Sequence, residues 1–148
     1  MAGNSPTTVN DDGSPQVNGE RPLRLMIVED DAIGALFLER SLIDLGYEVC
    51  ATADSAPAAV AAADQSRPDF VLMDIRLARG TDGVEAAREI RDRFDIGSMF
   101  LTAHNDAATL RRARAVEPLE FLIKPYSVRE LASAVAAAAI RAGHRRDA

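Results

Sequence analysis

The sequence predicts an α/β protein made of five strand-and-helix repeats, with one five-stranded parallel sheet covered by helices on both faces. Three observations lead to this prediction. Short apolar runs recur along the chain after residue 22, and a segment with helical spacing of apolar residues follows each run. Strands and helices that alternate in this way form an open, doubly wound (βα)5 sheet with right-handed crossovers. The chain has 148 residues, which fits one domain of ordinary size.

The five predicted strands are short, and four of them are expected to be buried on both faces. These four are continuous apolar runs at 25–28, 70–73, 99–101 and 121–123. Runs of this kind, bounded by polar residues, are typical of strands inside a parallel sheet. The fifth run, at 47–53, is interrupted by Glu48 and Thr52, which favours a position at the edge of the sheet.

Each of the first three predicted helices carries a recognisable end signal. Apolar residues spaced three and four apart between 35 and 45 indicate the first helix, and Gly46 provides its stop. Ser55 is placed to cap an alanine-rich second helix. Asp82 with Glu85 resembles a capping box that opens the third helix.

The last two predicted helices differ in the strength of their signals. Asn105 or Asp106 opens the fourth helix, whose apolar stripe is thin. Ser127 and Glu130 form a capping box for the fifth helix, which is expected to end at Gly143. The fourth helix carries an arginine cluster that is either a partner-binding patch or a solvated face: Arg111, Arg112 and Arg114.

Composition excludes several classes of protein. The chain has 23 acidic residues against 17 basic ones, and a net charge of −6 argues against direct binding of nucleic acid. The single cysteine, Cys50, excludes an internal disulfide framework and a cysteine-based zinc site. No apolar run approaches the roughly 18 residues of a membrane span, and no signal peptide is recognisable. We therefore expect a cytoplasmic protein that does not enter a membrane.

The two ends of the chain are predicted to lie outside the folded domain. Residues 1–22 are rich in glycine, proline and asparagine and contain few apolar side chains, which predicts a disordered tail. The domain is expected to cover 23–143, and 144–148 to form a short basic tail. Because nothing follows Ala148, no output domain is expected.

Polar residues follow the predicted strands where the functional crevice of such a sheet lies. They are Glu29, Asp30, Asp31, Asp74, Thr102 and Lys124. Carboxylates that converge repel one another unless a cation lies between them. Oxygen ligands without nearby histidine or cysteine indicate Mg²⁺, or Mn²⁺. With a hydroxyl and an ammonium group beside them, these are the groups that phosphoryl transfer to an aspartate requires.

These motifs resemble the receiver domain of two-component response regulators over roughly residues 23–142. The matching segments are 28–31, 72–74, 101–103 and 124–125. The resemblance implies a flavodoxin-like strand order, 2-1-3-4-5, in a stand-alone regulator of a two-component or phosphorelay system. It also implies a phosphoprotein that is not a dedicated enzyme. Its partners would be a sensor histidine kinase or histidine phosphotransfer protein and a downstream protein.

The resemblance also implies a role for each residue of the cluster. Asp74 matches the phosphoryl acceptor, and Lys124 the lysine that pairs with the phosphoryl group. Asp30 matches the direct Mg²⁺ ligand, and Glu29 the acidic partner that holds the metal through water. Arg76 would offer its backbone carbonyl to the metal.

Two further residues match the family's switch. Thr102 matches the hydroxyl that moves toward the phosphoryl group, although it is also a candidate N-cap. Phe121 matches the switch aromatic, although it is also a candidate core residue. One departure is Ala78, at a position where many receivers have proline, in a loop that is about one residue longer than in the chemotaxis regulators.

Four alternative functions compete with this interpretation. A phosphoryl carrier or phosphate sink without a surface switch uses the same pocket. A haloacid-dehalogenase-like aspartyl phosphatase needs a second aspartate two residues after the first, where this chain has Arg76. A flavodoxin-like cofactor binder needs a phosphate-binding loop after the first strand, where the acidic run 29–31 would repel phosphate. A phosphorylation-independent adaptor remains possible on sequence alone.

Overall fold

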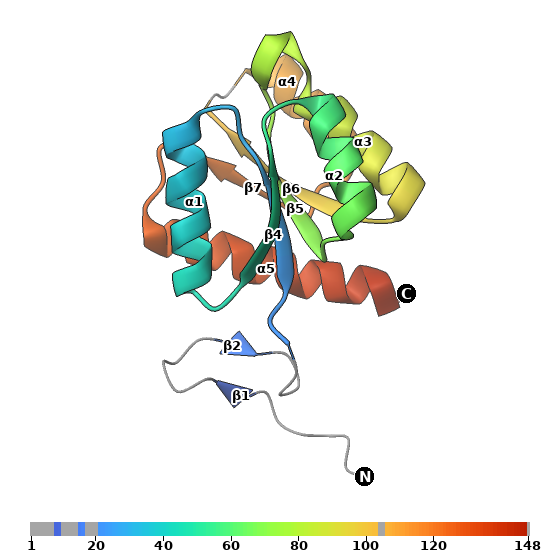
Figure 1. Cartoon of the computed structure of the whole chain (residues 1–148). Helices are drawn as coiled ribbons and strands as arrows, with labels where there is room; N and C mark the ends of the chain where they lie inside the picture. Colours follow the sequence, from blue (N-terminus) through green and yellow to red (C-terminus); the bar gives the residue numbers. More distant parts are fainter. Residues whose placement is uncertain (1–7, 10–14, 17–20, 104–105, 148) are drawn as a thin grey trace.

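A computed structural model shows a five-stranded parallel sheet with helices on both faces (Figure 1). The structure describes residues 8–9, 15–16, 21–103 and 106–147, with side chains described as far as 143. The strand order of this sheet is β4-β3-β5-β6-β7, and every neighbouring pair is parallel. Numbered by repeat, this order is 2-1-3-4-5, which confirms the predicted (βα)5 topology.

The strands lie where the apolar runs predict them. Their bounds are β3 (Arg24–Val28), β4 (Glu48–Ala53), β5 (Phe70–Asp74), β6 (Gly97–Thr102) and β7 (Glu120–Ile123). The edge position predicted for β4 is confirmed. The expectation that the last run is buried on both faces is wrong, because β7 is the opposite edge of the sheet and Ile123 is 52% exposed.

Five helices connect and follow these strands. Their bounds are α1 (Ala32–Asp44), α2 (Ala56–Ser66), α3 (Gly83–Phe94), α4 (Ala107–Ala115) and α5 (Val128–Asp147). The side chains of Ser55 and Asp82 cap α2 and α3 as predicted. Ser127 and Glu130 exchange hydrogen bonds at the start of α5, as a capping box does.

The predicted end of the last helix is wrong. α5 continues through Gly143 to Asp147, so 144–147 are helical and are not a separate tail. A glycine stops a helix when it takes a left-handed conformation, as Gly46 does after α1 with φ of 100°. Gly143 has no positive φ and remains inside the helix.

Part of the predicted N-terminal tail also differs from the expectation. Thr8–Val9 (β1) pairs antiparallel with Pro15–Gln16 (β2), in a ladder that needs backbone hydrogen bonds and little apolar burial. Nearer the domain, the Arg21 guanidinium donates a hydrogen bond to Asp69. The prediction of disorder for the remaining residues of 1–20 lies outside the described residues.

Two apolar layers form the core, one on each face of the sheet. Alternate residues of each inner strand point to opposite faces, so Met26 and Val28 join one layer while Leu25 and Ile27 join the other. The first layer packs under α2, α3 and α4, and the second under α1 and α5 (Figure 1). In the described part of the chain, no helix is both long and apolar enough to cross a membrane.

Candidate functional site

The site lies at the carboxyl end of the parallel strands, where the apolar run of each inner strand gives way to polar residues. Asp74 is the final residue of β5 and Thr102 is the final residue of β6. Glu29 and Asp30 directly follow β3, and Lys124 directly follows β7. Five of the six polar residues predicted for this crevice therefore meet at one edge of the sheet, and the sixth, Asp31, caps α1.

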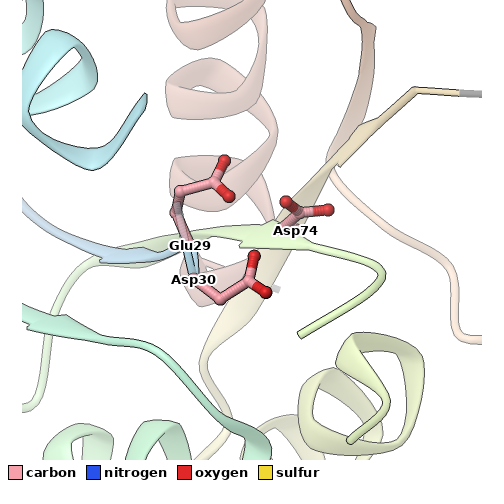
Figure 2. Close-up of side chains that lie close together, drawn as sticks. All are labelled: Glu29, Asp30 and Asp74. Atoms are coloured by element: carbon pink, nitrogen blue, oxygen red, sulfur yellow. The ribbon is translucent and has the colours of Figure 1, made fainter. Parts of the chain in front are cut away.

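Three carboxylates form its acidic cluster (Figure 2). Glu29, Asp30 and Asp74 each offer an oxygen, and these oxygens all lie within 4.8 Å of one another. Glu29 and Asp74 are buried, with 6% and 7% of their surfaces exposed, whereas Asp30 is open to solvent. Carboxylate oxygens with one open side fit a hard divalent cation such as Mg²⁺, which keeps several water ligands.

Lys124 neutralises two of these carboxylates. It is the only lysine in the sequence, and its Nζ donates hydrogen bonds of 2.8 Å to Glu29 Oε1 and Asp74 Oδ2. Burial alone would lower the pKa of Lys124, but the hydrogen bonds to the two carboxylates raise it above its ordinary value. For Glu29, burial has the larger effect on the pKa. Burial raises its pKa, and the hydrogen bond from Lys124 only partly offsets that rise.

A pocket of about 140 Å³ opens beside the acceptor candidate. Its lining residues are Asp74, Ile75, Arg76, Thr102, Ala103, Asp106, Thr109 and Lys124. Thr102 is 4% exposed at the end of its strand and does not cap α4. The N-cap is Asp106, whose carboxylate accepts hydrogen bonds from the Ala108 N–H and the Thr109 hydroxyl. The alternative reading of Thr102 as a helix cap is therefore wrong.

Sequence reasoning missed two residues of this pocket, Asp106 and Thr109. The sequence predicts Asp106 as a possible helix cap, and this is confirmed, but nothing in the local pattern indicates that the cap lines the same pocket as Asp74. The alternative cap, Asn105, lies outside the described residues.

Arg76 is the second residue of the loop that follows the acceptor strand. Its backbone N–H donates a 3.3 Å hydrogen bond to Asp74 Oδ1, and its side chain lines the pocket. The loop then turns through Arg79 and Gly80, with positive φ angles of 58° and 71°. The Ala78 N–H donates to the Asp54 carbonyl, a backbone bond that proline at this position would lose.

Gly83 lets α3 approach the acceptor strand closely, and sequence reasoning missed this role as well. A Cβ at position 83 would lie 2.0 Å from the carbonyl oxygen of Asp74. The Gly83 N–H donates a 2.7 Å hydrogen bond to the carbonyl of Ile75. The acceptor backbone is thus packed directly against the first turn of a helix.

The candidate switch aromatic contacts one ring and one guanidinium group. Phe121 is half-buried, and its ring centroid lies 5.9 Å from that of Phe100. The Arg114 guanidinium lies 5.8 Å from the centre of the Phe121 ring. Elsewhere on α4, Arg112 forms ion pairs with Asp82 and with Glu85 of α3. Two of the three arginines therefore have specific partners within the domain.

Comparisons with known proteins agree with this geometry. The chain matches the response regulator receiver domain family over residues 25–136. It is 34% identical over 120 residues to the transcriptional regulatory protein PdtaR of Mycobacterium tuberculosis, covering 81% of this chain and 58% of that protein.

Solved structures show the same fold. The chain is similar to the signal receiver domain of a modulated diguanylate cyclase from Desulfovibrio desulfuricans G20, with 33% identity and a TM-score of 0.76 over 82% of this chain and 97% of that one. It also matches the PhyR receiver domain of Erythrobacter litoralis, with 28% identity and a TM-score of 0.73 over 81% and 92% of the two chains.

The curated relatives are longer than the region that matches this chain. The chain spans about half the length of the curated relatives it matches, which include PdtaR and the phyllosphere-induced regulator PhyR of Methylorubrum extorquens. Receiver domains of this kind work with histidine kinases and downstream effectors and are not dedicated enzymes. Sequence, fold and the position of the acidic pocket agree, and the chain therefore belongs to the response regulator receiver domain family of two-component systems.

Proposed function

We propose that this domain accepts a phosphoryl group on Asp74 from the phosphohistidine of a partner, with Mg²⁺ beside it, and then switches a protein-binding surface. One observation carries the proposal. The buried Asp74 carboxylate shares one small pocket with Thr102 and Lys124, and it lies beside the oxygens of Glu29 and Asp30. Phosphoryl transfer to a carboxylate needs a nucleophile, positive charge and hydrogen-bond donors together in this way.

The transfer step uses Asp74 as the nucleophile. A carboxylate oxygen of Asp74 attacks phosphorus and forms a P–O bond while the P–N bond to the partner's histidine breaks. The bonding electron pair stays on the imidazole nitrogen, which takes a proton from water. Lys124 already contacts Asp74 Oδ2, so it is placed to meet a phosphoryl oxygen, and the Thr102 hydroxyl lines the same pocket. Both donors stabilise charge on the transferred oxygens.

The acidic cluster supplies the proposed metal ligands. Asp30 and Asp74 would bind the ion directly, Glu29 would bind it through water, and the carbonyl of Arg76 would complete the protein ligands. The bound ion would offset the negative charge that accumulates when a phosphoryl group meets three carboxylates. Mn²⁺ has the same preference for oxygen ligands and is the proposed substitute.

An apolar surface beside the pocket favours a protein as the donor. Ile33, Leu36 and Phe37 share one face of α1, and they are 80%, 53% and 43% exposed. Phe37 packs against Tyr126, with ring centroids 6.2 Å apart, and both line a shallow depression together with Glu29. Exposed apolar patches of this kind mark protein contacts. The proposed occupant is a sensor histidine kinase or a histidine phosphotransfer protein.

The proposed switch connects the pocket to α4 and β7. Movement of the Thr102 hydroxyl toward a phosphoryl group would change the space beside β6, where the Phe121 ring packs against Phe100. Because Arg114 of α4 lies over the same ring, a movement of Phe121 would reach the surface of α4. A phosphoryl group shifts such an equilibrium only by its different affinity for the two states, typically about 1–3 kcal/mol.

The position of Phe121 also supports a second candidate function. Its ring is half-buried and in contact with the core, so less inward movement is available than for an exposed ring. A receiver whose aromatic does not move would act as a phosphoryl carrier or a phosphate sink without a surface switch.

The single lysine makes the proposal directly testable. In a sample labelled with ¹³C only in lysine, Lys124 gives the one lysine ε-methylene signal. Adding beryllofluoride, a phosphoryl mimic, to protein already saturated with Mg²⁺ should shift this signal in the wild type and leave it unchanged in Asp74→Asn. Acetyl phosphate with Mg²⁺ should add one phosphoryl group by intact mass, again only when Asp74 is present.

Two results would change the conclusion. Mass addition that persists in Asp74→Asn would refute Asp74 as the acceptor. Beryllofluoride shifts that are confined to the pocket, with amide signals of residues 106–121 unaffected, would establish the carrier or sink in place of the switch.

A further inference from the structure

The loop after the acceptor strand is bonded to the start of α2, although the two segments are distant in sequence. The Ala56 N–H, the first of α2, donates a 3.0 Å hydrogen bond to the Thr81 hydroxyl oxygen. The Ala78 N–H donates at 3.1 Å to the carbonyl of Asp54, which precedes the N-cap of the helix. Neither bond has a role in the proposed transfer or in the proposed switch through Phe121.

The Thr81 hydroxyl is held by two hydrogen bonds. Its oxygen accepts from the Ala56 N–H, and its proton is donated to the Ala78 carbonyl at 2.9 Å. The first N–H groups of a helix have no partner inside the helix and need acceptors from elsewhere. In α2, the Ala58 N–H finds a local acceptor in the Ser55 hydroxyl at 3.3 Å. The Ala56 N–H depends instead on the acceptor loop.

The acceptor loop is a hairpin that carries Thr81 on its returning arm. The Leu77 N–H donates to the Thr81 carbonyl at 3.1 Å, and next to this bond the backbones of Arg76 and Asp82 form an antiparallel bridge. The Arg76 N–H donates to Asp74 Oδ1, so the outgoing arm begins at the acceptor carboxylate. A displacement at the acceptor end of this hairpin therefore moves Thr81 as well.

The start of α2 borders a surface groove that is separate from the acceptor pocket. α2 and α3 lie side by side (Figure 1), and the groove between them has a volume of about 540 Å³. Ala56 lines its end, with Pro57, Val60 and Ala61 along the same helix. The same N–H that bonds to Thr81 thus belongs to a residue that shapes this groove.

We propose that Thr81 is a positioning residue that couples Asp74 to the start of α2, so that the α2–α3 groove is a second surface that responds to phosphorylation. Two events act on the hairpin that carries Thr81. The acyl phosphate changes the carboxylate that accepts from the Arg76 N–H, and a bound metal ion would hold the Arg76 carbonyl. This inference rests on the proposed function of Asp74. Its route and its surface differ from those of the proposed switch through Phe121 and α4.

The test compares the signals that beryllofluoride shifts in protein already saturated with Mg²⁺, labelled with ¹⁵N and with ¹³C in lysine. In the wild type, the amide signals of Ala56 and of residues 58–61 should shift together with the Lys124 signal. Thr81→Val keeps the branched shape and removes the hydroxyl, so Lys124 should still respond while most of the α2 shift is lost. Thr81→Ser keeps the hydroxyl and should retain the α2 shift.

Ser55→Ala is the matched control. It removes the local cap of α2 and leaves the bond between Ala56 and Thr81 in place, so the helix loses stability but its response should persist. Hydrogen exchange without beryllofluoride checks the bond itself. The Ala56 amide should exchange about two- to tenfold faster in Thr81→Val, as the loss of one hydrogen bond implies, and at the wild-type rate in Thr81→Ser.

The outcomes separate this inference from the proposed function. If Lys124 does not respond in the wild type, the proposed function fails and the inference fails with it. If Lys124 responds but α2 does not, or if the α2 shift in Thr81→Val equals that of the wild type, only the coupling through Thr81 is wrong. Loss of the α2 shift in Ser55→Ala would show that the shift reports helix stability alone, and would also overturn the coupling.

Discussion

Gly83→Ala tests whether α3 must lie directly against the acceptor strand. A Cβ at this position would lie 2.0 Å from the carbonyl oxygen of Asp74 and 3.0 Å from the Cα of Ile75. Both contacts are to backbone atoms, so no side-chain rotation relieves them. The hydrogen bond from the Gly83 N–H to Ile75 holds the same two segments together. The substitution therefore pushes α3 and the acceptor backbone apart.

The size of the effect follows from this geometry. Non-bonded heavy atoms approach comfortably only to about 3.5 Å, so the two segments must separate by more than about 1 Å. Overpacking of this kind costs about 1–3 kcal/mol, and it is severe here because backbone must move. The higher helix propensity of alanine offsets at most about 1 kcal/mol of this loss in stability. We expect a net loss of about 2 kcal/mol, or a fall in Tm of about 6–8 °C.

Thermal unfolding followed by circular dichroism measures this loss, and the rate of Asp74 phosphorylation should fall in the same variant. Gly143→Ala is the matched control, because Gly143 lies inside α5 with no atom within 4 Å of an added Cβ. That variant should gain about 0.5–1 kcal/mol. If Gly83→Ala were as stable as the wild type, the close approach of α3 to Asp74 would be refuted.

Three further predictions concern burial and charge. Glu29→Gln should stabilise the domain at pH 7 without metal. Because the pKa of Glu29 is raised in the folded state, the wild type loses stability as pH rises past the ordinary glutamate range. The gain in the variant should therefore vanish near pH 4 in unfolding experiments. Arg112→Gln removes the ion pairs to Asp82 and Glu85. An exposed ion pair stabilises a protein by less than about 1 kcal/mol, so the α4 amides should exchange hydrogen up to about fivefold faster. Unchanged exchange would contradict this prediction. Ser98→Ala should raise the urea midpoint, because among the described residues the buried Ser98 hydroxyl has no hydrogen-bond partner; a lower midpoint would show that the hydroxyl is satisfied.

The sheet and most of the site could be predicted because their signals are local. Each inner strand is an apolar run that stops at a polar residue, and parallel strands bring those residues to one edge. This is why the convergence of Glu29, Asp74 and Lys124 was predictable without coordinates. The caps of α2 and α3 could be read for the same reason, since a cap and its helix are neighbours in sequence.

The remaining features depend on packing between distant segments. Nothing near Asp106 in the sequence shows that α4 begins beside Asp74. The role of Gly83 depends on the distance between a helix and a strand, and glycine after aspartate reads equally well as a turn. The exposure of Ile123 follows from the edge position of β7, and an apolar run does not reveal whether a strand is inner or outer. Gly143 continues its helix because a glycine stops one only in a left-handed conformation.

The most direct test of the central claim is to locate the phosphoryl group chemically. Borohydride reduces an acyl phosphate on aspartate to homoserine, which peptide sequencing by mass spectrometry can place. Trypsin should release peptide 41–76, because Pro68 prevents cleavage after Arg67. After treatment with acetyl phosphate and Mg²⁺, homoserine is predicted at position 74 of that peptide. Homoserine at another carboxylate such as Asp30, or none at all in protein whose mass shows an added phosphoryl group, would contradict the assignment of Asp74 as the acceptor.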